Sequence, residues 1–219
     1  MIIDTHIHLY DPFRPGGAPW PDPADETIYL TTLPDRLTER ARPAGMDGAI
    51  VVECSGWVED NQWVLDLADD EPFIVGLVGN LDIHDERFGE HLDRFSKHPL
   101  FLGIRARLWQ PDDLSRLRRL ADLDLSLDLG ISEQTLKIAS EIPELRIVIN
   151  HSANIKMDGD APESDAVDLM RRAAAHPRRA PRRRGGRTVP CRGCHLRPRR
   201  EHGAADHVRT ERAGARPYD

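Results

Sequence analysis

The feature that most constrains the fold is a regular alternation along the first 170 residues, where short apolar, β-branched runs are separated by longer segments with helical periodicity. In the longer segments, apolar residues recur three or four positions apart, and several segments begin near a Ser or Asp that can cap a helix. This alternation is typical of βα units around a parallel sheet. The six predicted strands are residues 1–7, 48–54, 73–79, 100–106, 123–129 and 146–152, and the predicted helices lie within 60–69, 86–97, 111–122, 132–142 and 166–177.

The cadence of these six units predicts an α/β fold of the (β/α)8 barrel type. Such barrels typically need about 250 residues, so a chain of 219 residues is expected to hold only about six of the eight units. An open doubly wound sheet is the alternative, but it would carry a glycine-rich phosphate loop after the first strand. A Pro-rich loop at residues 11–25 stands there instead. We therefore predict a truncated barrel over residues 1–175 and a disordered basic tail over residues 176–219.

The charge distribution separates the same two regions. The net charge is −7, yet the segment from Arg171 onward holds fifteen arginines against four acidic residues, with no apolar periodicity that could bury a core. No apolar run approaches the roughly 20 residues of a membrane-spanning helix, and the N-terminus lacks the features of a secretion signal. Three cysteines without dense spacing fit a reducing compartment. We expect a cytoplasmic protein with no membrane partner.

Two histidines in the first predicted strand are the first candidates for chemistry. Side chains alternate along a strand, so His6 and His8 point to the same side as Asp4. In a barrel that side is the interior, and both imidazoles would reach the C-terminal mouth where barrel enzymes keep their chemistry. Two neutral imidazoles there suit a divalent metal such as zinc, which lowers the pKa of a bound water to about 7. Hydrogen-bonded polar residues at a strand end are the alternative that spacing alone leaves open.

A third histidine strengthens the catalytic interpretation. His151 follows the sixth predicted strand and is expected at the same rim. Alone, a histidine at a strand end is more often a hydrogen-bonded polar residue than a ligand. Together with the first-strand pair it favours a site, so we predict His6, His8 and His151 as catalytic residues and as the ligands of any bound metal.

Four stretches together resemble the amidohydrolase superfamily, specifically the amidohydrolase-related family with its lactonase-like members. They are DTHIHLYDPFRPGGAPWP, VVECSGWVEDNQWVLDLADDEPFIVGLVGNLD, FLGIRARLW and IPELRIVINHSA, in the expected order and spacing over about residues 1–170. Members of that family include sugar lactonases, a pyrone dicarboxylate lactonase and several aromatic-acid decarboxylases. The resemblance implies a TIM-barrel hydrolase, metal-dependent in many members.

The resemblance also assigns residues. The first-strand histidine pair of the family falls on His6 and His8, and its later-strand histidine on His151. The arginine after Gly-Ile on the fourth strand falls on Arg105, which we predict to bind an anionic substrate group through its guanidinium fork. Glu53, at the end of the second predicted strand, is predicted to orient substrate. A structural ion pair for Arg105, and a solvated or paired carboxylate for Glu53, are the alternatives.

Two departures from the family pattern bear on the metal. Metal-dependent relatives usually add a histidine on the fifth strand, where this sequence offers only Asp124, Ser126 and Asp128. The family also places an aspartate in a GSDWP-like stretch at the end of its eighth strand, and no such stretch follows Ala175. The resemblance therefore allows a zinc-like divalent metal. It equally allows a metal-free hydrolase in which Arg105 and the histidines polarise the carbonyl while a carboxylate activates water.

The function expected from these residues is hydrolysis of a small carbonyl substrate, with a lactone as the favoured class. A metal-dependent decarboxylase of a small aromatic or muconate-like acid is the alternative within enzymes, and the missing fifth-strand histidine disfavours it. A barrel without its last two strands leaves free sheet edges. Such a chain could instead be inactive, or could pair with another copy as a homo-oligomer.

The basic tail admits four interpretations. CRGCH, from Cys191 to His195, matches the pattern of covalent haem attachment. Cys191 and Cys194 with His195, His202 and His207 could bind zinc. An arginine-rich arm could bind nucleic acid through phosphate contacts, although its only aromatic residue is a tyrosine. The favoured interpretation is a frame-shifted translation of a GC-rich gene, which leaves nucleic acid as an unexpected partner.

Overall fold

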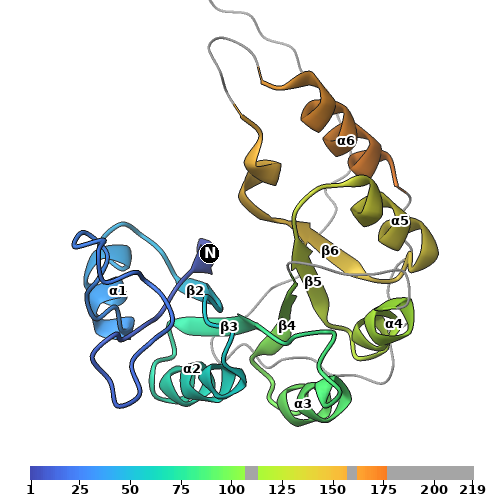
Figure 1. The fold of residues 1–219 in the computed structure, drawn as a ribbon. Coiled ribbons are helices and arrows are strands. Elements are labelled where there is room, and N and C mark those ends of the chain that lie inside the picture. The colour runs from blue at the N-terminus through green and yellow to red at the C-terminus, as the bar shows by residue number, and fades with distance from the viewer. Residues whose placement is uncertain (107–112, 157–161, 177–219) are drawn as a thin grey trace, which may run out of the picture. The chain divides into compact units, whose positions relative to one another are not determined.

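The computed structural model describes residues 1–106, 113–156 and 162–176. Its strands form one parallel sheet in sequential order from β1 to β6, with helices between them (Figure 1). The strands are β1 (Ile3–Ile7), β2 (Gly48–Val52), β3 (Ile74–Gly79), β4 (Phe101–Arg105), β5 (Ser126–Leu129) and β6 (Arg146–Ile149). The helices are α1 (Pro34–Ala41), α2 (Val58–Asp70), α3 (Phe88–Phe95), α4 (Leu114–Asp122), α5 (Glu133–Glu141), the short 3-10 helix η2 (Asn150–Asn154) and α6 (Ser164–Ala175).

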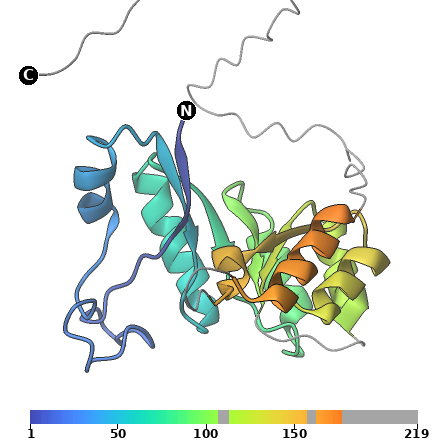
Figure 2. The same ribbon diagram turned by 90° about the horizontal axis from the view of Figure 1, so that it is seen from above.

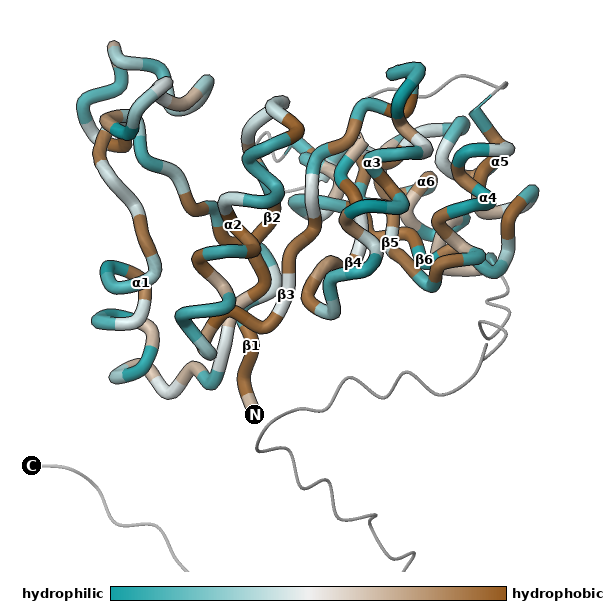
Figure 3. The backbone as a smooth tube through the Cα atoms, turned by 90° about the horizontal axis from the view of Figure 1, so that it is seen from below, coloured by the Kyte–Doolittle hydropathy of each residue, from teal (hydrophilic) through white to brown (hydrophobic). Residues whose placement is uncertain are grey.

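The centre of the sheet is buried on both faces. Val51, Leu77, Ile104 and Leu127, one from each strand from β2 to β5, are each at most 1% exposed. Figure 3 shows the hydrophobic colour running along these strands. A parallel strand covered on both faces is expected to be a nearly continuous apolar run. This is why the central strands could be located from the sequence.

Helices α2 to α5 lie in an arc outside the strands (Figures 1 and 2). In α3 the residues buried against the sheet are Phe88, Leu92 and Phe95, which follow the four- and three-residue spacing of one helix face. In α4, Leu117 and Leu120 are fully buried with the same periodicity. The apolar spacing in the sequence therefore predicted both the helices and the faces that they bury.

The helix α1 was not predicted. It begins at Pro34 and buries only Pro34 and Ala41. Proline is well suited to the first turn of a helix, because the first backbone N–H groups have no partner inside the helix. A single proline next to a Pro-rich loop gives no periodic signal, so the helix was hidden in the sequence.

The two outer strands each have one free edge in the described part of the chain. β1 pairs with β2, and β6 pairs with β5, while Val148 of β6 is 45% exposed. The ring centroids of His6, on β1, and His151, just after β6, are nevertheless 4.5 Å apart. The sheet therefore curves until the ends of its outer strands approach each other. Sequential strand order and this curvature confirm the predicted (β/α)-barrel architecture, with six units in the described residues, as opposed to a doubly wound sheet.

A cavity lies beside each free edge. One of about 410 Å³ lies between α5, β6 and α6, where Leu136, Ile147 and Met170 contribute apolar walls. The other, of about 300 Å³, lies between β1 and α1 and is bordered by Asp4 and His8. Helix α6 has no buried residue, so it covers β6 only loosely.

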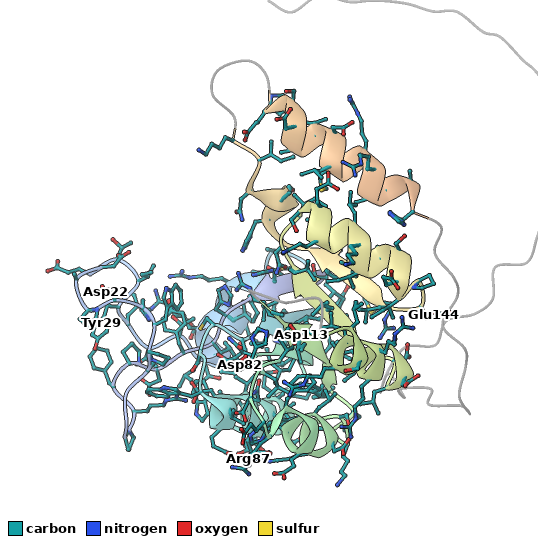
Figure 4. All side chains as sticks on the ribbon, turned by 45° about the vertical axis from the view of Figure 1, so that its right-hand side comes forward. Asp22, Tyr29, Asp82, Arg87, Asp113 and Glu144 are labelled. Carbon is teal, nitrogen blue, oxygen red and sulfur yellow. The ribbon has the colours of Figure 1, made fainter. Side chains whose placement is uncertain are left out.

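The loop between β3 and α3 is fastened by a histidine held between two carboxylates. His84 Nε2 lies 2.9 Å from Asp113 Oδ2, and its Nδ1 lies 3.6 Å from Asp82 Oδ1. Figure 4 labels both aspartates, which lie near each other. These contacts join the loop to the start of α4.

No helix among the described residues is long and apolar enough to cross a membrane. The predicted basic tail, residues 176–219, lies outside the described residues except for His176. Its four interpretations, and the boundary predicted at residue 175, stay predictions.

Candidate active site

The carboxyl ends of the strands bring the predicted site residues to one edge of the sheet, because all six strands run parallel. His6 and His8 lie at the end of β1, Glu53 directly follows β2, and Arg105 is the last residue of β4. The His6 ring lies between two other imidazoles, with its centroid 5.1 Å from that of His8 and 4.5 Å from that of His151. The three histidines expected to converge therefore do lie together.

His6 is held in its neutral form. Burial lowers its pKa to about 4, and the positive charges of His8, His151 and Arg105 add to this effect. The Nε2 atom of His6 is buried and has no hydrogen-bond partner. At neutral pH this ring carries no charge and keeps one nitrogen free.

His8 is oriented by a backbone carbonyl. Its Nδ1 lies 2.6 Å from the carbonyl oxygen of Val52, and a carbonyl can only accept, so Nδ1 carries the hydrogen. The Nε2 atom is then the acceptor. Burial also lowers the pKa of His8. The bond to Val52 opposes this effect, and the charges of Arg105 and His151 add to the lowering.

His151 reaches the site from irregular backbone beyond β6. The strand predicted to run to residue 152 ends at Ile149, so the prediction was wrong for its last three residues. His151 has φ 50° and ψ 38°, and Ser152, Ala153 and Asn154 also have positive φ. Left-handed backbone cannot continue a strand, and non-glycine residues rarely adopt it. The turn directs the imidazole toward His6.

Glu53 is a buried carboxyl group with one free oxygen. It is 2% exposed, and its Oε1 accepts hydrogen bonds from the backbone N–H groups of Cys54 and Ser55, both at 2.8 Å. Its Oε2 is buried without a partner. Burial raises the pKa of Glu53 to about 7, against the opposing effect of these backbone bonds.

Asp128 is a site residue that the sequence did not identify as functional. It is 3% exposed on β5, and its Oδ1 is buried without a partner. Burial raises its pKa to about 6, although the charge of Arg105 and a bond to Ser126 oppose this. A carboxylate inside the short apolar run Ser-Leu-Asp-Leu was the available signal, because an aspartate is seldom fully buried without a reason.

Three buried polar atoms in the described part of the chain have no hydrogen-bond partner. Among the described residues, the buried side-chain nitrogen and oxygen atoms that lack any partner are His6 Nε2, Glu53 Oε2 and Asp128 Oδ1. All three belong to residues at the carboxyl edge of the sheet. Buried polar atoms are normally hydrogen-bonded, so such a cluster indicates a place where a ligand completes the contacts.

The loop after β1 supplies an aromatic wall beside His8. The centroid of the Trp20 ring lies 5.7 Å from that of His8 in an edge-to-face arrangement, and 4.9 Å from that of Tyr10. Tyr10 and Thr32 exchange two backbone hydrogen bonds that close the loop, at 3.1 and 2.8 Å. Tyr29, labelled in Figure 4, contacts the ring of Phe13 within the same loop. The Pro-rich loop was predicted from the sequence, whereas Trp20 was not identified there as part of the site.

The imidazoles fit a metal ion by their donor type. His6 Nε2 is free and buried, and the Val52 carbonyl orients His8 in the way that hydrogen-bonded partners orient metal-binding histidines. Within the described ranges, however, no group of three or more His, Cys, Asp or Glu is arranged to hold a metal. The donor chemistry therefore fits a metal such as zinc, while the arrangement does not itself form a complete set of ligands.

Comparison with known proteins identifies the family. A family model described as Amidohydrolase matches residues 3–210. The chain belongs to the amidohydrolase family. The resemblance predicted from the sequence is thereby confirmed, and the matched range includes most of the basic segment as well as the six-stranded sheet.

Within this amidohydrolase family, a curated relative is an L-fucono-1,5-lactonase from Burkholderia ambifaria. It is 27% identical over 188 residues, which covers 80% of this chain and 64% of the lactonase. The chain therefore spans slightly less than two thirds of the length of this relative.

Solved structures agree on the fold. An amidohydrolase from Burkholderia multivorans with bound zinc aligns at a TM-score of 0.69 and 20% identity, covering 81% of this chain and 67% of that protein. A probable 2-pyrone-4,6-dicarboxylic acid hydrolase from Acinetobacter baumannii, with citric acid bound, aligns at a TM-score of 0.55 and 16% identity over 71% of this chain and 60% of that one.

Proposed function

We propose that this protein is a hydrolase that opens a small lactone at the carboxyl edge of its sheet. The observation that carries the proposal is the cluster of unpartnered buried atoms on His6, Glu53 and Asp128 beside three imidazoles and a guanidinium. Opening a lactone requires groups that polarise a carbonyl, activate water and protonate an alkoxide. The likeness to an L-fucono-1,5-lactonase supports the lactone as the substrate class.

The protonation states suit this chemistry. His6, with its pKa lowered to about 4, is a neutral acceptor at pH 7. Glu53, with its pKa raised to about 7, is present in both forms near neutrality and can take a proton from water or return one to the leaving oxygen. Arg105 has no hydrogen bond or ion pair with another described residue, so its guanidinium is free to donate to a carbonyl oxygen or an anionic group.

His6, His8 and His151 are the residues that would hold a divalent metal, and the Burkholderia multivorans neighbour contains bound zinc. A bound metal would polarise the carbonyl and lower the pKa of a bound water.

The structure does not favour the alternative function, a metal-dependent decarboxylase. That hypothesis expects a histidine on the fifth strand, and β5 carries Asp128 there instead.

The test is a hydrolysis assay of the full chain on L-fucono-1,5-lactone, simple sugar lactones and 2-pyrone-4,6-dicarboxylate, with and without a chelator. We expect turnover of at least one lactone, lowered about 100-fold or more in His6→Asn and His151→Asn. His91→Asn, on α3 outside the sheet, is the matched control and should keep full activity. A folded chain that opens none of these lactones would refute the proposal, and metal content measured by atomic emission would decide between the metal-bound and metal-free forms.

A further inference from the structure

Arg105 and Asp128 face each other across neighbouring strands at the candidate site. They are register partners between β4 and β5, and the next residue, Ala106, donates its backbone N–H to the Asp128 carbonyl at 3.0 Å. Neighbouring strands lie about 4.8 Å apart, and register partners in a parallel pair project to the same face. The guanidinium and the carboxylate therefore emerge side by side.

The two side chains nevertheless do not form an ion pair. No N–O contact within 4.0 Å joins them in the described part of the chain, although the charge of Arg105 acts on the Asp128 carboxylate. Asp128 Oδ1 stays buried and unpartnered. A buried carboxylate oxygen without a hydrogen-bond donor destabilises the folded state, yet the neighbouring guanidinium of Arg105 does not donate to it. The arrangement suits a ligand that offers an acceptor to Arg105 and a hydroxyl donor to Asp128.

The other buried carboxyl group does not offer the same pairing. Glu53 lies after β2, two strands away from Arg105, and its Oε1 is already occupied by two backbone N–H groups. The acceptor next to Arg105 is therefore Asp128. Two oxygens on adjacent carbon atoms of a ligand can reach the two side chains at once.

Resting on the lactone hydrolysis proposed above, we propose that Arg105 and Asp128 select lactones that carry a hydroxyl on the carbon next to the carbonyl. Arg105 donates to the carbonyl oxygen, and Asp128 Oδ1 accepts the hydrogen of the adjacent hydroxyl. A lactone without that hydroxyl leaves the buried oxygen unpaired, and sites built to bind a substrate hydroxyl discriminate strongly for this reason.

The test compares two probes that differ by one hydroxyl, α-hydroxy-γ-butyrolactone and γ-butyrolactone. Both hydrolysis, followed by acid release, and binding, followed by calorimetry, are measured with the full chain. We expect the hydroxylated probe to be preferred about 10- to 100-fold in each measurement. Asp128→Ala should reduce the preference to less than about threefold, and Asp128→Asn, which keeps the size of the side chain, should reduce it to an intermediate value.

Asp124→Asn is the matched control, because Asp124 lies just before the amino end of β5, where its carboxylate faces Arg146, and asparagine tolerates its φ of 58°. It should keep the preference of the unmodified chain. Equal binding of the two probes, or an Asp128→Ala variant that weakens both equally, would overturn the inference. Absence of hydrolysis for both probes and for the wider lactone panel would refute lactone hydrolysis alone, since the binding ratio still decides whether Asp128 reads the hydroxyl.

Discussion

Two of the places where the described part of the chain buries charged side chains treat these side chains in opposite ways. On the loop after β1, Arg14 Nη2 lies 2.6 Å from Asp60 Oδ1, its Nε donates to the Gly17 carbonyl at 2.8 Å, and its guanidinium stacks 4.3 Å from the centroid of the Trp63 ring. At the carboxyl edge of the sheet, Glu53 and Asp128 each leave one oxygen without a partner.

The difference separates a polar site that anchors a loop from the candidate functional site. The Arg14 cluster satisfies its charges internally and fixes the loop that carries Trp20 to helix α2. At the strand ends, His6, Glu53 and Asp128 each keep one buried atom without a hydrogen-bond partner, at an energetic disadvantage to the folded state. Burial alone does not indicate function, whereas burial combined with missing partners does.

The largest effect is expected where a satisfied charge loses its partner. Asp60→Asn leaves the Arg14 guanidinium, whose side chain is only 14% exposed, without its anion. We expect the free energy of unfolding to fall by about 3 kcal/mol, because breaking a buried pair leaves an uncompensated charge. Urea denaturation at pH 7 measures this. A loss below about 1 kcal/mol would contradict the assignment of this cluster as the anchor of the loop.

Neutralising Glu53 should raise the free energy of unfolding at high pH, whereas Asp60→Asn should lower it. Glu53 has its pKa raised from 4.5 to about 7 in the folded state, so between these pH values the folded chain binds more protons than the unfolded chain. Its stabilising contribution is fully present below pH 4.5 and is lost as the pH rises through 7. Glu53→Gln does not titrate, so it should gain about 2 kcal/mol relative to the unmodified chain between pH 5 and pH 8.

The measurement for Glu53→Gln is the free energy of unfolding of both proteins in urea at pH 5, 6, 7 and 8. Gln62→Glu, on the exposed face of α2, is a control for the general effect of changing one charge and should show little pH dependence over this range. A stability difference between Glu53→Gln and the unmodified chain that does not change with pH would mean that the Glu53 carboxyl keeps an ordinary pKa in the folded state.

The sequence predicted the repeating part of the fold well. Central strands such as β3 are continuous apolar runs, and helices such as α3 show one apolar face, so both followed from local patterns. The helix α1 and the left-handed turn at His151 did not follow. Neither has a periodic signal, and the conformation of the turn depends on contacts that the sequence does not display.

The candidate site also divides into residues that the sequence predicted and one that only the structure identified. The first-strand histidines followed from strand alternation, and the family resemblance added Glu53 and Arg105. All four end or follow predicted strands, so parallel strand order brings them to one edge. The significance of Asp128 depends on the register between β4 and β5 and on the absence of a partner for one oxygen. Register and hydrogen-bond satisfaction are tertiary properties, so a single sequence cannot provide them.

A smaller effect is expected at a polar group that has its hydrogen bond and is only partly buried. Ser132 caps helix α5, because its side chain accepts the backbone N–H of Thr135 at 3.2 Å. Ser132→Ala should lower the free energy of unfolding by about 1 kcal/mol, because one N–H of the first turn loses its acceptor. Ser132→Asp, which retains an acceptor, is the control and should restore most of the loss; an equal loss in both variants would exclude capping as the cause.

The smallest effect is expected at the neighbour of Asp60. Glu59 forms a two-pronged ion pair with Arg94 at 2.7 and 2.8 Å, but its side chain is 71% exposed, so water screens the pair. Glu59→Gln should change the free energy of unfolding by less than about 0.5 kcal/mol, and less still in 0.5 M salt. It is measured in the same urea series as Asp60→Asn. Both substitutions turn a carboxylate of α2 into an amide of the same length, so the comparison varies burial. If the two substitutions proved equally destabilising, burial would not be what distinguishes the Arg14 anchor, and the contrast between its satisfied charges and the unpartnered oxygens of Glu53 and Asp128 would lose its energetic basis.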